Sequence, residues 1–229
     1  MLFFDPMYLM LLAPALILSL WAQWKVKRNF AKYSKVPSSS GLTGAQVAKS
    51  ILAGNGLHNV RIEQVPGRLS DHYDPASRVL RLSPEVYDGR SVAAAGIAAH
   101  ECGHALQHAA AYSPLVLRQT LAPAAIWGSN LSWIFIMAGM LVSSLRSLTW
   151  VGIALFSVAV LFSLVTLPVE FDASSRAKKV LPSLGLVSGS DRDGVAAVLN
   201  AAAMTYVAAA ATAILQLVYF VLRANSSRN

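Results

Sequence analysis

The most prominent pattern along the chain is a set of four stretches that contain no Asp, Glu, Lys or Arg. They cover residues 6–24, 121–143, 148–169 and the interior of 195–222. Each is close to the roughly 20 residues that a helix needs to cross the hydrocarbon core of a bilayer. Buried helices of a soluble protein are also apolar, but four of this length in 229 residues predict four transmembrane helices.

Between the first and second stretches, the polar pattern predicts a small region of mixed helices and strands. Residues 42–57 have the pattern of a helix, because Thr43 and Gln46 stand at capping-box spacing and a Gly-Asn-Gly turn follows. Residues 58–65 and 78–83 alternate like strands, and the segment between them is rich in turn formers. We expect the second strand to be of the edge type. Ser91 can cap a further helix of about 20 residues.

The charged residues predict how the chain is oriented in the membrane. No positive charge precedes the first stretch, whereas KVKRNFAKYSK follows it, so it is typical of a retained anchor and not of a secretory signal. Of the 19 Lys and Arg residues, 16 lie in 25–118 and 170–194 and three lie in the segments on the other side. The positive-inside rule therefore places both termini outside. Because topology explains the basic charge, we expect a lipid bilayer as a partner and no nucleic acid.

These patterns predict a mainly α membrane protein with a small cytoplasmic α+β portion. The expected segments are an N-terminal anchor at 1–24, a cytoplasmic segment at 25–115, a transmembrane hairpin at 116–169, a second cytoplasmic segment at 170–194, and a final transmembrane helix and tail at 195–229. The single cysteine, Cys102, excludes an intramolecular disulfide and is expected to be a small packing residue.

The sequence HECGH, at residues 100–104, lies in the middle of the helix predicted after Ser91. Residues four apart on a helix differ by about 40° in azimuth and about 6 Å in height, so His100 and His104 can converge on one metal ion. Glu101 points past that ion and can act as a general base toward water. A carboxylate in the middle of a span costs roughly 2.5 to 3.5 kcal/mol, so we expect a surface or partly buried helix. The motif predicts a site for one Zn²⁺ ion.

A catalytic zinc site needs a third protein ligand, and the topology favours Glu170. Two predicted spans separate His104 from Glu170, so the chain returns to the same side of the membrane. Asp172 is the rival ligand, but it lies about 200° around a helix from Glu170, so both cannot easily face one metal. Two histidines and a glutamate with an open water position form an established catalytic zinc set.

Two other functions fit parts of this pattern. A zinc-binding membrane scaffold or adaptor without proteolytic turnover would need the histidines but not Glu101. An intramembrane protease of the site-2 type would have its HExxH motif inside one span and an aspartate ligand in another, but no predicted span contains Asp. We therefore expect an endopeptidase that acts on peptide or membrane-protein substrates, and the scaffold is the alternative.

Several motifs together resemble a known family. The segments AAHECGHALQH, SDHYDPASRVLRLSPEVY, VEFDASSRAKKVL and VLNAAAMTYVAAA are similar to those of the bacterial neutral zinc metallopeptidases of the YugP-like membrane family. This resemblance implies a zinc peptidase of the bacterial cytoplasmic membrane with a zincin-like portion. More distantly, EFDAS resembles the EFxAD segment of the Ste24- and HtpX-like membrane gluzincins. The resemblance implies that Glu170 is the third ligand, and it makes Asp172 or Ser174 a candidate to orient His104, since Ser174 replaces the Asp of that segment.

The resemblance also implies a place for the substrate. Zincins bind substrate as an added strand against an edge strand that precedes the HExxH helix. Here that strand would be formed by Val79, Leu80, Arg81 and Leu82. His72 is a candidate donor to the oxyanion that forms during peptide hydrolysis.

Overall fold

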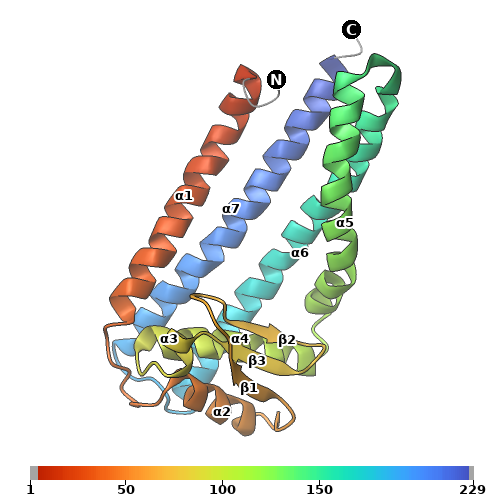
Figure 1. The fold of residues 1–229 in the computed structure, drawn as a ribbon. Coiled ribbons are helices and arrows are strands. Elements are labelled where there is room, and N and C mark those ends of the chain that lie inside the picture. The colour runs from red at the N-terminus through yellow and green to blue at the C-terminus, as the bar shows by residue number, and fades with distance from the viewer. Residues whose placement is uncertain (1–4, 227–229) are drawn as a thin grey trace. The chain divides into compact units, whose positions relative to one another are not determined.

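The computed structural model describes residues 5–226, and most of them are helical (Figure 1). Four helices are long and apolar enough to cross a membrane: α1 (Pro6–Tyr33), α5 (Ser113–Leu141), α6 (Ser147–Ser183) and α7 (Asp191–Ser226). The four predicted spans fall on these helices, and the short 3₁₀ turn η2 (Ser143–Leu145) lies between α5 and α6. The protein is therefore mainly α, as expected.

The chain forms two compact units. The helical unit consists of Met1–Trp21, Val116–Pro168 and Thr205–Asn229, of which residues 1–4 and 227–229 lie outside the described part. The mixed unit consists of Ala22–Leu115 and Val169–Met204.

In the helical unit, a cluster of large side chains forms the core. Its fully buried members include Ile136, Tyr219 and Phe220, and the Phe220 ring meets the rings of Trp133 and Phe156 edge-on at centroid distances of 5.5 and 5.6 Å. Other large apolar side chains of this unit point outward. For example, Ile126, Ile134 and Leu141 are 60%, 63% and 76% exposed. Apolar side chains on the outside as well as the inside are typical of helices in contact with lipid.

The mixed unit contains two capped helices, the second of which carries the HECGH segment, and a small sheet. The first is α2 (Gly44–Gly54), in which Thr43 and Gln46 form the predicted capping box. The second is α4 (Val92–Ala109), whose N-cap is Ser91, as predicted. The short helix α3 (Pro84–Tyr87) precedes α4. These elements pack around a core that includes the fully buried side chains of Val47, Ile51, Leu80, Leu82 and Val86.

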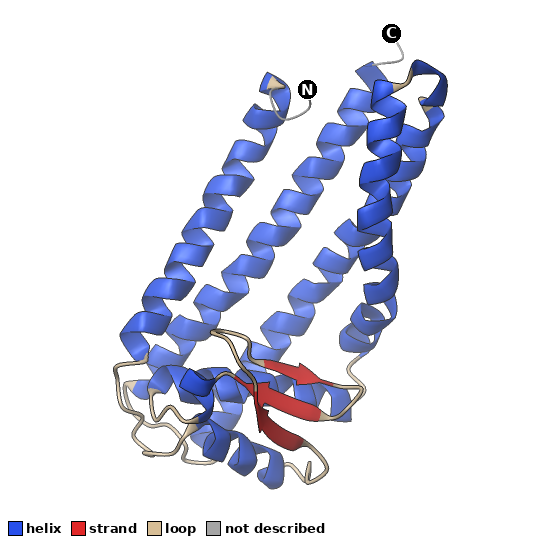
Figure 2. Cartoon of the chain, in the orientation of Figure 1, coloured by secondary structure: helices blue, strands red, loops and turns tan. Residues whose placement is uncertain are grey.

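The sheet has three strands, and their order corrects one expectation (Figure 2). The strand β3 (Val79–Leu82) lies in the centre, parallel to β1 (Arg61–Gln64) and antiparallel to β2 (His72–Asp74). The prediction that Val79, Leu80, Arg81 and Leu82 form an edge strand is therefore wrong. The error arose because β2 is only three residues long and stands among turn formers, so its sequence shows too little alternation.

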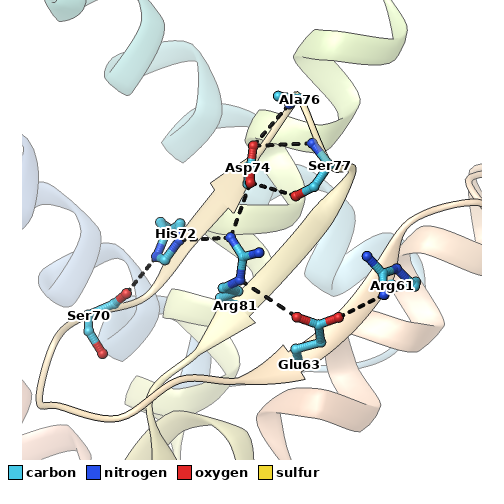
Figure 3. A network of polar contacts seen from close by, with 8 residues as sticks. All are labelled: Arg61, Glu63, Ser70, His72, Asp74, Ala76, Ser77 and Arg81. Carbon is cyan, nitrogen blue, oxygen red and sulfur yellow. Dashed lines mark hydrogen bonds and ion pairs between the residues drawn. The ribbon is translucent and has the colours of Figure 1, made fainter.

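The outward side of the sheet carries a network of ion pairs and hydrogen bonds (Figure 3). Arg81, on the central strand, contacts Glu63 on β1 at 3.6 Å and Asp74 on β2 at 3.2 Å. Asp74 also accepts hydrogen bonds from the backbone and hydroxyl of Ser77. These bonds from Ser77, together with Arg81, lower the pKa of Asp74 to about 2. The network therefore joins all three strands and closes the turn between β2 and β3.

Candidate metal centre

Three side chains from two helices of the mixed unit converge on one point. His100 and His104 stand on α4 and Glu170 stands on α6, and one potential ligand atom of each lies within 4.8 Å of the others. The Glu170 Oε2 atom is 3.2 Å from His100 Nε2 and 3.6 Å from His104 Nε2. The Glu170 side chain is 3% exposed, and those of His100 and His104 are 13% and 12% exposed. The three residues predicted as ligands are thus brought together.

The spacing of these atoms fits a zinc ion. Two atoms that each lie about 2.1 Å from zinc, at a tetrahedral angle, are about 3.4 Å apart. The two distances from the Glu170 carboxylate, 3.2 and 3.6 Å, bracket this value. Two imidazole nitrogens and a carboxylate oxygen are also ligand types that zinc prefers.

The ring of His104 is held by a residue that the sequence reasoning missed, Gln107. The Gln107 side chain is fully buried, and its Nε2 atom donates to the Val169 carbonyl at 2.7 Å and to Asp172 Oδ2 at 2.8 Å. Because both partners are acceptors, the amide orientation is determined, and Oε1 faces His104 Nδ1 at 3.0 Å. His104 must therefore carry a proton on Nδ1, so Nε2, which faces Glu170, is the nitrogen that would bind a metal once it holds no proton of its own.

Asp172 and Ser174, the two residues of α6 that were expected to orient His104, do not contact its ring directly. Ser174 was a candidate to orient His104, but its hydroxyl lies 3.1 Å from Nδ1 of His100 instead. Asp172 reaches His104 only through Gln107, and it also accepts a hydrogen bond of 2.6 Å from Arg176 Nε. Each histidine thus has its own partner at Nδ1. Gln107 could have been found from its position three residues after His104, on the same face of the helix.

A close approach of α4 and α6 positions Glu170 beside the histidines. A Cβ atom added at Gly103 would lie 2.5 Å from the backbone oxygen of Ala173. Only glycine can stand at this point without a shift of one helix. Gly103, the one residue of HECGH without a side chain, therefore determines how near α6 comes to α4.

The electrostatics of the cluster favour a charged glutamate. Burial by itself would raise the pKa of Glu170, but hydrogen bonds from His100 and His104 outweigh it and hold that pKa well below its usual range. Burial would likewise lower the pKa of His104, but the hydrogen bond to Glu170 and the negative charge of Glu101 raise it above the ordinary value. A carboxylate ligand must be ionised, so the cluster presents Glu170 in the form that a metal requires.

Glu101 stands next to the cluster without a partner in the protein. It is 8% exposed, and among residues 5–226 its carboxylate forms no hydrogen bond or ion pair. On an ideal helix its azimuth differs by about 100° from that of His100 and by about 60° from that of His104. Its direction along the helix therefore differs from that of the two histidines.

His72 and Cys102, also named from the sequence, lie outside the cluster, and so does a third histidine of α4, His108. His72 is exposed on β2, and its ring nitrogens face the Ser70 carbonyl at 2.8 Å and Arg81 at 3.5 Å. His108 is joined to the Tyr73 hydroxyl of β2 through Nδ1 at 2.9 Å. Cys102 is fully buried, and burial raises the pKa of its thiol well above the usual value. It is a packing residue, as expected.

Comparison with known proteins agrees with this geometry. A curated protein named "Putative membrane protease YugP", from Bacillus subtilis (strain 168), is 52% identical over 216 residues, which cover 94% of this chain and 96% of that protein. No solved structure matches the chain. The sequence profile of a family described as "Putative neutral zinc metallopeptidase" matches residues 8–225. Since that match covers almost the whole length, this membrane protein belongs to the neutral zinc metallopeptidase family.

Proposed function

We propose that the protein is a membrane-embedded, zinc-dependent endopeptidase in which His100, His104 and Glu170 bind one Zn²⁺ ion and Glu101 is the general base. The observation that carries this proposal is the convergence of two histidine Nε2 atoms and a buried carboxylate beside an unpaired Glu101. The family and the name of the curated relative, a membrane protease, support it. The HExxH motif with a glutamate as third ligand is that of a gluzincin-like site.

The protein groups around the cluster suit peptide hydrolysis. A bound zinc ion supplies Lewis acidity, which makes water acidic enough to lose a proton near neutral pH. Glu101 accepts that proton as water attacks the peptide carbonyl, and it then delivers a proton to the leaving amine. Gln107 and Ser174 hold the rings of His104 and His100 from behind, so the ligand nitrogens keep their direction during the reaction.

We propose that an extended peptide substrate pairs with β2. The sequence had suggested β3 for this role, but β3 is the central strand. β2 is an edge strand, so its outer backbone groups are available to pair with an extended peptide. Tyr73 of β2 is bonded to His108, which is one helical turn beyond His104 on α4, so the strand lies beside the helix that carries the ligands. His72, on the same strand, stays a candidate oxyanion donor.

The distribution of charge supports one orientation in the membrane. The 16 Lys and Arg residues on the predicted inner segments, against three outside, favour an orientation with both termini outside and the metal centre at the cytoplasmic face of a bacterial cytoplasmic membrane. The substrates that reach such a site are cytoplasmic peptides or cytoplasmic parts of membrane proteins.

Replacing the general base tests this function. Glu101→Gln should keep the zinc content of the purified full-length protein, because Glu101 is not a ligand. It should abolish cleavage of an unfolded model protein, because the amide cannot accept the proton. Zinc is measured by atomic emission, and cleavage is measured by mass spectrometry of the products.

Glu170→Ala is the matched control, and it should lose both zinc and cleavage. Continued cleavage by Glu101→Gln would refute Glu101 as the base. A wild-type protein that binds zinc and cleaves none of a broad set of peptides would favour the scaffold alternative.

A further inference from the structure

The mixed unit has a cavity that does not involve the metal cluster. Its volume is about 600 Å³, and it lies where the end of α1, the loop that carries Arg68, and the segment before α4 meet. Phe30, Ala31 and Pro37 form an apolar part of its wall. Nothing in peptide hydrolysis at the metal centre requires this cavity, so it needs its own explanation.

The charged groups of the cavity are mostly cations from three separate segments. Lys35 follows α1, Arg68 stands in the loop before β2, and Arg90 precedes α4. The one carboxylate in the wall, Glu85, is paired with Arg68 at 3.0 Å. The Arg90 guanidinium donates to the Gly41 carbonyl at 2.6 Å, whereas the Lys35 ammonium forms no hydrogen bond or ion pair within residues 5–226. The cavity therefore has a net positive charge and is suited to an anion.

The position of the cavity along α1 indicates where that anion comes from. Trp24 ends the predicted first span, and Phe30 stands six residues later on the same helix and in the same compact unit. At 1.5 Å per residue this is about 9 Å. The headgroup layer extends roughly 5 to 7 Å beyond the hydrocarbon core. The cavity thus begins just beyond the headgroup layer, and the long basic side chains in its wall can extend toward the phosphates of anionic lipids, which attract them.

The cavity also touches the start of the helix that carries the metal ligands. Ser91, in its wall, accepts the capping hydrogen bond from the backbone of Ala94 at 3.2 Å. Pro37 and Ser91 form an isolated β-bridge, and the Val92 amide donates to the Val36 carbonyl at 2.9 Å. An occupant of the cavity would therefore contact both the end of α1 and the N-terminus of α4.

We propose that this cavity binds the phosphate headgroup of an anionic phospholipid from the leaflet that surrounds the end of the first span. The headgroup pairs with Lys35 and Arg90, and the adjoining glycerol and acyl groups lie against Phe30 and Ala31. The lipid thereby tethers the beginning of α4 to the membrane surface. This site is independent of the peptidase activity and of which side of the membrane the metal centre faces.

Lipid retention tests the proposal. Full-length protein is reconstituted into phosphatidylcholine vesicles that contain a minor share of phosphatidylglycerol and is extracted in mild detergent, and the lipids retained per chain are counted by mass spectrometry. The wild type should retain phosphatidylglycerol in preference to phosphatidylcholine. Lys35→Glu should reduce this preference about fivefold or more, since each basic residue near an anionic surface contributes about that factor.

Lys49→Glu is the matched control, because Lys49 is an exposed lysine of α2 in the same unit that does not line this cavity. It should retain phosphatidylglycerol like the wild type, and all variants should keep their zinc content. Lys35→Gln, a milder change, should give a smaller loss. Equal losses in Lys35→Glu and Lys49→Glu would overturn the proposal in favour of general surface attraction. Displacement of the lipid by millimolar inorganic phosphate would overturn it in favour of a soluble anion.

Discussion

At the scale of single residues, the side chains that hold the two histidine rings are as important to the proposed metal centre as the candidate ligands themselves. Gln107 contacts His104 with its carbonyl oxygen and contacts two acceptors on α6 with its amide nitrogen. One buried side chain therefore selects the histidine tautomer and also links α4 to α6. No shorter polar residue has both a donor and an acceptor at this reach.

We expect Gln107→Ala to weaken zinc binding by about 10- to 100-fold, because His104 then lacks the partner that fixes its ring and tautomer. Competition with a fluorescent chelator measures the zinc affinity, and circular dichroism shows that the helices remain. Gln64→Ala is the control, since Gln64 is an exposed glutamine bonded to Asp88 on another part of the same unit. An unchanged zinc affinity in Gln107→Ala would show that His104 is oriented by its packing alone.

The convergence of His100, His104 and Glu170 could be predicted from the sequence, but the partners of the two histidines could not. The spacing of HECGH predicts the position of two histidines because helix geometry is regular. The topology then restricts the third ligand to a few acidic residues. In contrast, Ser174 was expected at His104 and lies at His100, because a pairing between two helices depends on their rotation about their axes. No pattern in the sequence predicts how far each helix is rotated about its axis.

At the scale of elements, the closest packing in the metal centre is between α4 and α6. Gly103 and Ala173 allow the two backbones to approach, and Glu170 stands one turn before Ala173. The distance from Glu170 to the two histidines therefore depends on the absence of a side chain at Gly103.

Gly103→Ala should push α6 away from α4 and lower zinc affinity by at least tenfold, because the new methyl group would lie 2.5 Å from the Ala173 carbonyl oxygen. Gly96→Ala is the matched control on the same helix, since its methyl group would meet Val195 at an ordinary 3.5 Å. It should bind zinc normally and be as stable as the wild type or more so, as alanine favours a helix by about 1 kcal/mol. Thermal unfolding and zinc competition distinguish the pair, and equal zinc affinity in both variants would contradict the packing argument.

The elements were predictable where local signals were strong. The capping box of α2 and the N-cap of α4 depend on neighbours within three residues, and both are as expected. The strand β2 depends on pairing with β3 and on the turn held by Asp74, so its three residues give no clear local signal. Because β2 was not predicted from the sequence, β3 was expected to be an edge strand, although it lies in the centre of the sheet.

At the scale of the whole molecule, the orientation in the membrane stays a prediction from charge. Cys102 makes it easy to test, because its thiol is buried and its raised pKa keeps it protonated at neutral pH. Cysteines can therefore be added at exposed positions without removing the natural one.

In intact bacterial cells with a permeable outer layer, a membrane-impermeant maleimide should label Ser143→Cys but should label Lys49→Cys only after the inner membrane is opened. Ser143 lies between α5 and α6, on the predicted outer side, and Lys49 lies on α2, on the predicted inner side. The wild type should remain unlabelled until it is denatured. The opposite labelling of the two variants would place the metal centre outside.

The separation of the ligands along the chain has a consequence for biosynthesis. His104 and Glu170 are 66 residues apart, and α5 and most of the apolar part of α6 lie between them. At translation rates of about 5 to 20 residues per second, Glu170 is made about 3 to 13 s after His104. During that interval the nascent chain has two of the three side chains of the proposed metal centre, so this cluster cannot assemble before α5 and the first part of α6 have been synthesised. The order of the sequence thus delays formation of the cluster until about three quarters of the chain has been made.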